Sequence, residues 1–525
     1  MSLKLTVAAL VWTVALMLSR ALGLVRDAVL GQTLGVGIEA DVYAAAFRIP
    51  DLLTYVVSGG ALSIVFIPMF TRFYSEGDEE RAWRAYSRVA NFIVVLAAIL
   101  VPTLLLAMPR LCAWFFPGFD AAAQAQLVFL SRVVLPAQVF HLLSGILSAA
   151  LVSRDQHAVP ALAPLVYNLA IIVGGWVGGD AEGFAWGVLA GSFLGPFLLP
   201  LWAARRAGLR WMPLLDLRHP DFLAYLRGAL PIMLAFSLVG LDDFAWTHFA
   251  AGSPGDVATL SYAKALIRVP IGVFGFAMGM AAYPELSRLY AQGRRAEAWV
   301  LLRTATLRAL VLALGAQVVL SAAGPEAGTL VYSAARIPPQ RLDELAACLW
   351  AFALALGPWT VQTLVARGFY ARGRTWVPTL WGTAVLLLSL PVYALGFQRL
   401  GALGLALASS LAITVYVVSL YAKLDRDVRE GEGVGRDILK LCAAAALAVG
   451  AGLSARAILP PFAYTRLDAA WRIGIIAVVT NTVFVGVAWG LGVAELRGLA
   501  RQVARRLPGA GAATGAPTRP DKPDP

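Results

Sequence analysis

Ionisable side chains stand inside several stretches of this sequence that are otherwise apolar. They form four groups: Arg20, Arg26 and Asp27; Asp41, Arg48 and Asp51; Asp242 and Asp243; Lys264 and Arg268. An ionisable residue within a membrane costs several kcal/mol and normally faces a cavity or a partner. The first, second and fourth groups hold five cations against three acids, and this surplus of positive charge indicates an anionic ligand. Guanidinium groups are suited to phosphate, which they bind through two parallel hydrogen bonds.

The spacing of these charges places several of them on common helix faces. Arg20 and Asp27 are seven residues apart, as are Asp41 and Arg48, so each pair lies on one face of a helix. Two simpler interpretations stay open. The charges could form internal ion pairs that only lock helices together, or the long side chains could reach the membrane interface.

Lys264 and Arg268 form a pair of cations separated by about one helical turn. We expect them in one cavity with the arginines of the first two groups, because a lipid-facing pair would be costly. The alternative is that one of them pairs with Asp242 or Asp243 on the preceding span.

The composition requires elements that cross a membrane. Of 525 residues, 59% are apolar and 14% charged, against roughly 45–50% and 25% in soluble domains, and the mean hydropathy is +0.73. The net charge of +12 comes with basic residues in short loops between apolar runs, which is typical of membrane proteins, so no nucleic-acid partner is predicted. Three cysteines and four histidines are too few and too scattered for a disulfide framework or a metal site.

About fourteen stretches are long and apolar enough to be membrane-spanning helices. The predicted spans lie near 6–30, 39–69, 86–108, 125–151, 160–178, 184–204, 223–250, 258–284, 298–322, 344–366, 376–397, 401–422, 436–458 and 471–495. No small-residue cleavage site follows the first stretch, so we interpret it as an uncleaved helix. Arginines concentrate in the loops after even-numbered spans, which predicts that both termini are cytoplasmic.

Two similar turns indicate an internal repeat. Residues 153–160 and 371–378 are short basic turns that end in a proline at the start of a helix, six spans apart. This favours two six-helix lobes with an added pair of helices, the usual construction of alternating-access transporters. The predicted division is 1–215 for the first lobe, 216–428 for the second, 429–496 for the last two helices and 497–525 for a basic, disordered cytoplasmic tail.

Several strings of residues resemble one family of membrane proteins. In chain order they are Ser19-Arg-Ala-Leu-Gly-Leu-Val-Arg-Asp27; Asp41 with Ala46-Phe-Arg-Ile-Pro-Asp-Leu-Leu53; Gly60-Ala-Leu-Ser63 and Phe66-Ile-Pro68; Pro117-Gly-Phe119; Ala163-Pro164 with Asn168; Tyr262-Ala263 with Pro270, Gly272, Phe274-Gly275 and Pro284; and Arg367-Gly-Phe-Tyr-Ala371 with Pro378. Together they resemble the MurJ (MviN) family of lipid II flippases in the MOP exporter superfamily.

The resemblance implies a fold, a substrate and residue roles. It implies an all-α protein with two six-helix lobes in a V around a cationic cavity, and a groove for a lipid tail formed by the last two helices. The implied substrate is lipid II, an undecaprenyl-pyrophosphate-linked disaccharide-pentapeptide that is moved from the inner to the outer leaflet of the bacterial cytoplasmic membrane by a monomer. By resemblance Arg20 and Arg26 contact phosphate, Asp41 is an essential cavity acid and Arg48 occupies a basic family position.

The chain departs from the family pattern at two arginine positions, which are Thr54 and Ala265 here. Lys264 and Arg268 are the candidates to replace that charge, and we include both in the expected substrate site.

Three acids, Asp27, Asp51 and Asp243, are further candidates for the cavity or for an ion site. Some relatives bind sodium through a seventh-helix Asp, which Asp243 matches, and through eleventh-helix polar groups. Since 376–397 contains neither Asn nor Asp, we expect no sodium and no cofactor.

Three other functions compete with this interpretation. A flippase for another polyprenyl-linked sugar would use similar chemistry, whereas a MATE-like drug exporter would need an acidic cavity for cationic drugs. A membrane-embedded glycosyl- or phosphotransferase would need carboxylates at the membrane edge. The acidic clusters at 76–80 and 425–432 lie among arginines in hydrophilic loops, and no Walker A, H-E-x-x-H or G-x-S-x-G motif is present, so we expect no enzyme.

Overall fold

The structure is a computed structural model that describes residues 3–57, 65–154, 156, 158–333, 337–374, 376–426, 434–493 and 495–496. The first half contains α1 (Leu3–Leu34), α2 (Ile38–Ala46), α3 (Arg48–Val57), α4 (Ile67–Ser75), α5 (Glu79–Phe115), α6 (Ala121–Val134), α7 (Ala137–Val152), α8 (Ala158–Gly178), α9 (Ala181–Ser192), the π-helix η2 (Phe193–Leu198) and α10 (Leu199–Arg206). The Gly60–Ser63 string and the tail 497–525 lie outside the described residues.

The rest of the chain is also helical where it is described. It contains α11 (Pro220–Ala250), α12 (Asp256–Pro270), the π-helix η3 (Ile271–Phe276), α13 (Ala277–Ala291), α14 (Arg295–Ala322), α15 (Gly324–Tyr332), α16 (Pro339–Ala353), α17 (Leu356–Ala371), α18 (Trp376–Arg426), α19 (Gly435–Ile458) and α20 (Arg466–Gly490). The predicted all-α class is therefore confirmed.

Nine helices of the described residues are long and apolar enough to cross a membrane, or ten if α16 and α17 form one bent span. The multi-pass architecture is confirmed, while the count of fourteen stays a prediction. Helix α18 covers two of the predicted spans, 376–397 and 401–422, which meet at Gly401. The backbone there is non-helical, with φ 57° and ψ −137°, a conformation open to glycine because it has no Cβ.

Aspartate side chains define the starts of several helices. Asp78, Asp120 and Asp180 each precede a helix and accept a hydrogen bond from the backbone N–H three residues later, at 3.0, 2.8 and 2.7 Å. Such caps satisfy one of the free donors in the first turn, which sets where α5, α6 and α9 begin.

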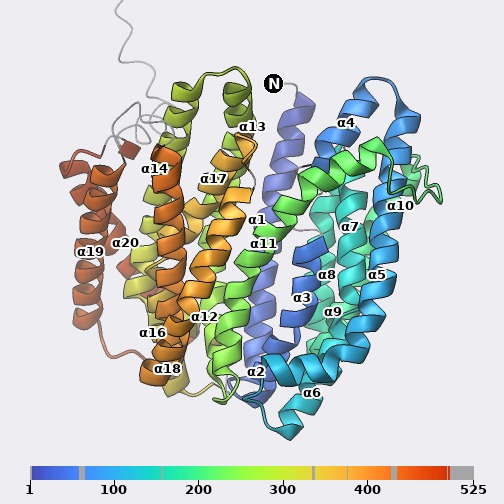
Figure 1. The fold of residues 1–525 in the computed structure, drawn as a ribbon. Coiled ribbons are helices and arrows are strands. Elements are labelled where there is room, and N and C mark those ends of the chain that lie inside the picture. The colour runs from blue at the N-terminus through green and yellow to red at the C-terminus, as the bar shows by residue number, and fades with distance from the viewer. Residues whose placement is uncertain are drawn as a thin grey trace, which may run out of the picture.

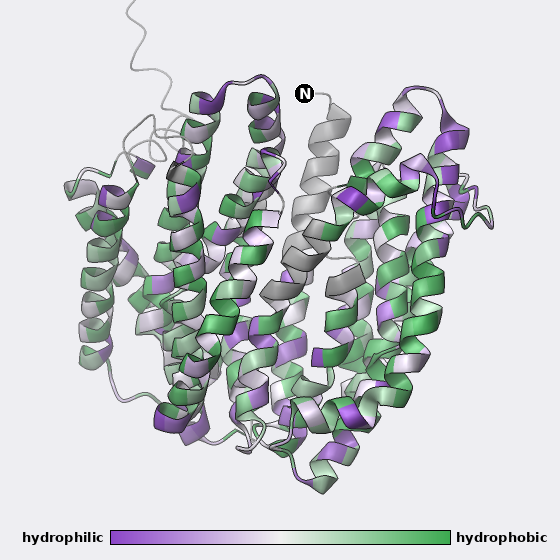
Figure 2. Ribbon diagram, viewed as in Figure 1, coloured by the Kyte–Doolittle hydropathy of each residue, from purple (hydrophilic) through white to green (hydrophobic). Residues whose placement is uncertain are grey.

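The helices of the first and second halves lie on opposite sides of the molecule (Figure 1), and α19 and α20 lie at the outer edge of the second half. Helix α8 packs between α1 and α9, and α14 packs against α17, α19 and α20. The outward faces of α5 and α19 are largely hydrophobic, whereas hydrophilic residues gather at helix ends and between α3 and α12 (Figure 2).

Helix α11 crosses diagonally between the two halves (Figure 1). Near its start, Phe222 packs on Phe92 and Tyr225 packs on Phe66, with ring centroids 5.2 and 6.4 Å apart. Its later part packs along α18. The second half therefore begins with a helix whose first turns belong to the packing of the first half.

The two halves meet at the end of the molecule where α2 and α6 lie, at the bottom of Figure 1. The Tyr262 hydroxyl donates to the carbonyl oxygen of Gly35 across 3.0 Å. The backbones at Gly118 and Gly252 approach so closely that a Cβ at residue 118 would lie 2.5 Å from the nitrogen of Gly252. We call this set of contacts, together with the Asp41 contact described below, the closed end.

Candidate ligand-binding site

Two adjoining cavities lie between the halves and collect most of the predicted site residues. One, of about 290 Å³, is lined by residues that include Asp243 and Lys264, and the other, of about 270 Å³, by residues that include Arg26 and Asp27. Arg48, Asp51 and Arg268 line both cavities. The structure thus brings together side chains from α1, α3, α11 and α12.

Arg26 is held in a fixed orientation at the wall of the smaller cavity. Its Nη2 is 2.7 Å from Oδ1 of Asp27, and its Nη1 donates to Oδ1 of Asn168 on α8 across 3.1 Å. The side chain keeps 29% of its surface exposed. A guanidinium that Asp27 and Asn168 hold in place while part of its surface stays exposed can receive an anion without first losing much rotamer freedom.

Arg48 extends from α3 of the first half to groups of the second half. Its Nε donates to Oγ1 of Thr247 across 2.9 Å, and its Nη2 donates to Oγ of Ser261 across 3.4 Å. Its Nη1 is 3.7 Å from Oδ2 of Asp243, and the guanidinium lies 4.6 Å from the centre of the Trp246 ring. Arg48 therefore connects the two halves.

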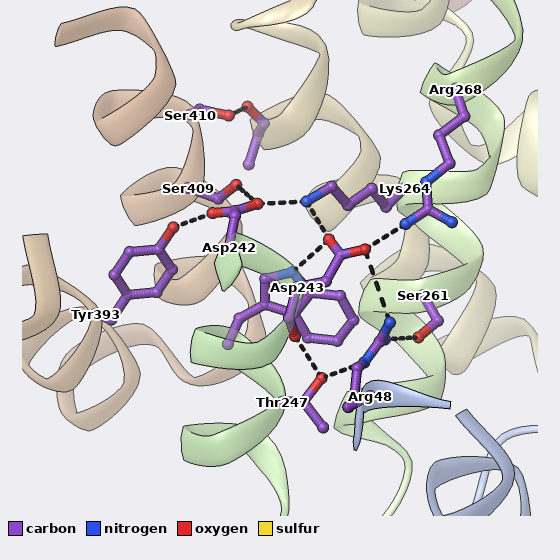
Figure 3. A network of polar contacts seen from close by, with 12 residues as sticks. Arg48, Asp242, Asp243, Thr247, Ser261, Lys264, Arg268, Tyr393, Ser409 and Ser410 are labelled. Carbon is purple, nitrogen blue, oxygen red and sulfur yellow. Dashed lines mark hydrogen bonds and ion pairs between the residues drawn. The ribbon is translucent and has the colours of Figure 1, made fainter. Parts of the chain in front are cut away.

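Lys264 lies between the carboxylates of Asp242 and Asp243 (Figure 3) and forms an ion pair with each. Its side chain is only 6% exposed, so the ammonium is shielded from solvent. The pairing that the sequence left open is thus formed with both acids in this conformation. Lys264 nevertheless also lines the larger cavity, together with Arg268, which pairs with Asp243.

Asp242 is anchored by two hydroxyl groups of α18 that the sequence reasoning did not single out. The Tyr393 hydroxyl donates to Oδ1, and the Ser409 hydroxyl donates to Oδ2 across 2.9 Å. A signal for them existed, since a hydroxyl in an apolar span needs a hydrogen-bond partner.

Arg268 brings further positive charge to the space between the halves, whereas Arg20 is not among the described residues that line the two cavities. The Arg268 side chain is 54% exposed and lines both cavities. The Arg20 guanidinium lies beside Gly272 of η3, where a Cβ would stand 3.0 Å from its Cζ. The glycine leaves room for the arginine to lie against the backbone of the second half.

Asp41 lies at the closed end and is fully buried. Its Oδ1 accepts a hydrogen bond from the backbone N–H of Ala258 across 2.7 Å, and its Oδ2 accepts one from Gly255, so it caps the N-terminus of α12. It is not among the described residues that line the two cavities. A carboxylate at a helix N-terminus is favoured by the free N–H groups and the helix dipole.

The two departures from the family pattern have different surroundings. The Thr54 hydroxyl donates to Oε1 of Gln138 across 2.5 Å, and Nε2 of Gln138 donates to Asp51 across 3.2 Å. Ala265 lines the smaller cavity with Arg268. Thr54 therefore begins a chain of hydrogen bonds that ends at Asp51. Ala265 leaves space beside Arg268 in the smaller cavity.

Comparison with known proteins identifies the family. A profile described as lipid II flippase MurJ matches residues 30–483. The chain belongs to the lipid II flippase MurJ family. Relatives include a probable lipid II flippase MurJ of Rhizobium meliloti (strain 1021), 26% identical over 93% of this chain and 94% of the relative, and the lipid II flippase MurJ of Burkholderia cenocepacia, 24% identical over 71% and 74%. The resemblance found in the sequence is confirmed.

Solved structures agree on the fold. A lipid II flippase MurJ in an inward closed conformation superposes with a TM-score of 0.74, at 20% identity, over 90% of this chain and 98% of that one. An inward-facing multidrug resistance MATE family transporter of the MOP superfamily gives 0.67, at 15% identity, over 80% and 98%. The MATE interpretation is weaker, because the family profile and the curated relatives are MurJ proteins.

Within the described part of the chain, no group of three or more His, Cys, Asp or Glu side chains could hold a metal ion. The expectation of no sodium and no cofactor remains a prediction.

Proposed function

We propose that the chain transports lipid II from the inner to the outer leaflet of the bacterial cytoplasmic membrane by alternating access, as a transporter and not as an enzyme. Family membership supports the substrate. The observation that carries the proposal is the convergence of Arg26, Arg48 and Arg268 on one cavity between the halves.

The cations of the cavity suit the diphosphate group of such a lipid. A diphosphate carries several negative charges, and guanidinium groups bind its oxygens in pairs of parallel hydrogen bonds. Arg26 offers a pre-oriented group, while Arg268 is exposed enough to rotate toward the ligand. Arg20 and Lys264 complete the proposed headgroup site.

The positions of the closed end and of the loop charges suggest which way the cavity opens. The connections 35–37 and 251–255 at the closed end contain no arginine or lysine. By the positive-inside rule that end faces outward and both termini are cytoplasmic. The conformation is then an inward-facing one, and the groove formed by α19 and α20 would hold the lipid tail beside a monomeric transporter.

Rescue of a flippase-depleted bacterium by this chain, combined with an assay that measures protection of labelled lipid II from an external reagent, tests the proposal. The wild type should rescue growth and make labelled lipid II accessible to the external reagent. Arg26→Ala should do neither. Rescue without lipid II movement, or movement only of another polyprenyl-linked sugar, would overturn it.

A further inference from the structure

The carboxylate of Asp243 is the point at which the cations of the two halves converge (Figure 3). Lys264 pairs with Oδ1, to which Nε1 of Trp246 also donates across 3.3 Å. Arg268 pairs with Oδ2, and Arg48 lies 3.7 Å from the same oxygen. A carboxylate offers about four lone-pair sites. Three hydrogen-bond donors and, at 3.7 Å, the guanidinium of Arg48 therefore surround Asp243, and they come from three helices.

This arrangement places one negatively charged group, with two acceptor oxygens, where three cations can reach it. A phosphate group presents the same kind of oxygens to guanidinium and ammonium donors. Asp243 also lines the larger cavity, so its cations are not sealed away from a ligand that enters there.

We propose that Asp243 is a positioning residue that takes the place of a phosphate group in the empty site, and that the phosphate of the ligand displaces it. The inference rests on the proposed function, because it requires a ligand that bears a diphosphate. In the absence of a ligand, Asp243 keeps Arg48, Lys264 and Arg268 close together. Without its carboxylate these three cations would repel one another in a medium of low dielectric constant.

Displacement of Asp243 by a phosphate also affects the contact between the two halves. Arg48 belongs to α3 of the first half, while Asp243, Thr247 and Ser261 belong to the second half. When a phosphate attracts Arg48, its contacts to these three groups break. Ligand binding thereby removes a connection between the halves.

Asp242 does not take part in the exchange. The hydroxyls of Tyr393 and Ser409 hold its carboxylate against α18, and its side chain is not among the described residues that line either cavity. Asp242 keeps a negative charge next to Lys264 after Asp243 has lost its cations.

The test measures binding of a short-chain prenyl diphosphate to the purified full-length protein in detergent. Asp243→Asn should bind it about tenfold more tightly than the wild type, because the internal competitor for the cations is gone. Glu80→Gln is the charge-matched control. It removes one negative charge from an exposed side chain that lines neither cavity, so the affinity should change by less than about threefold.

Two more variants separate charge from fold. Asp243→Glu keeps the charge and should stay within about threefold of the wild type. Asp243→Ser removes the charge in a second way and should also bind more tightly, so a misfolded Asp243→Asn protein would not end the test. Asp243→Asn and Asp243→Ser should also transport more slowly. In these variants no carboxylate competes with the bound phosphate for the cations, so release of the ligand becomes slower.

The experiment distinguishes failure of the proposed function from failure of the role proposed for Asp243. If the wild type does not bind the prenyl diphosphate, or if Arg26→Ala binds it equally well, the proposed function fails. If the wild type binds it and Asp243→Asn binds no more tightly than Glu80→Gln, the role of Asp243 alone is overturned.

Discussion

The carboxylate of Asp41 on α2 and the backbone N–H of Ala258 on α12 are joined by a hydrogen bond of 2.7 Å that crosses from one half of the protein to the other. The acid is completely buried and also accepts a bond from Gly255. Alternating access requires this contact to break, because it lies at the closed end.

Asp41→Ala should weaken the closed end and abolish transport while the protein still inserts. The first turn of α12 loses its capping group, at a cost of about 1 kcal/mol or more. The reporter is Ser261→Cys, a residue that lines the cavity, labelled from outside with a membrane-impermeant thiol reagent. Labelling should rise in the Asp41→Ala background, and unchanged labelling would contradict a gating role.

The arginines of α1 should be needed for ligand charge and not for insertion. Arg20→Ala and Arg26→Ala are each expected to abolish lipid II transport at normal membrane levels. Lysine at either position should be partly active, since an ammonium cannot make two parallel bonds. Asn168→Ala, which removes an anchor of Arg26, should lower transport less than Arg26→Ala does. Transport at the wild-type rate by both alanine variants would remove the headgroup assignment.

Lys264→Met should destabilise the protein, because it leaves Asp242 without its buried cation. Breaking a buried pair costs about 3–5 kcal/mol. The double variant Lys264→Met with Asp242→Asn should recover most of the melting temperature in detergent. If Lys264 also binds substrate, the double variant stays inactive, and Ala265→Arg should restore transport to Lys264→Met. Full activity of the double variant would instead make the pair purely structural.

The orientation of the chain can be measured by cysteine labelling in intact cells. Of the described cysteines only Cys442 is exposed, so Cys442→Ser provides a clean background. Pro254→Cys should react with an external reagent, while Arg295→Cys should react only after the cells are permeabilised. Both positions are exposed in the structure, so a reversed pattern would mean a reversed topology.

One ion pair at the opposite end from Asp41 should make stability depend on pH. The Arg81 guanidinium donates to Asp221 across 2.8 Å and lowers the pKa of that carboxyl below its usual value. The stabilisation is therefore complete above the unfolded pKa of about 3.9 and is lost as the pH falls through the lower, folded value.

Asp221→Asn should accordingly be less stable than the wild type at neutral pH, by about 1 kcal/mol, because Arg81 is half exposed. The difference in melting temperature should shrink between about pH 5 and pH 3. Glu80→Gln is the control, since the exposed Glu80–Arg84 pair should contribute almost nothing. A constant difference at every pH would rule out the ionic origin.

The charged residues of the site could be found from the sequence because each stands in an apolar run where a charge is costly. For Lys264 and Arg268 the sequence named Asp242 or Asp243 as an alternative partner, but it could not decide which acid forms the pair. Asp242 and Asp243 are neighbours in the chain but point to different groups around α11, and Lys264 reaches both. Local spacing says nothing about which of two adjacent acids faces a helix on the other side.

The partner of Asp41 could not be predicted from local spacing either. Its partner Ala258 is 217 residues away, so only the packing of the two halves decides that this acid caps a helix instead of lining a cavity. A cap such as Asp78 depends on residues only three positions apart and is a local signal, yet the predicted span 86–108 does not extend to the start of α5 at Glu79. The two predicted spans 376–397 and 401–422 correspond to two helical segments of α18 that are joined across a kink at Gly401.

The continuous helix α11 joins the contact of Asp221 to the contact of Asp243. A straight helix at about 1.5 Å per residue would extend about 33 Å between these two positions. A helix that stays intact acts as a lever, so a tilt about a fulcrum between these points swings its two ends in opposite directions. A tilt of α11 that opened the protein at one end would close it at the other end. A single rigid helix would then prevent both ends from being open at the same time.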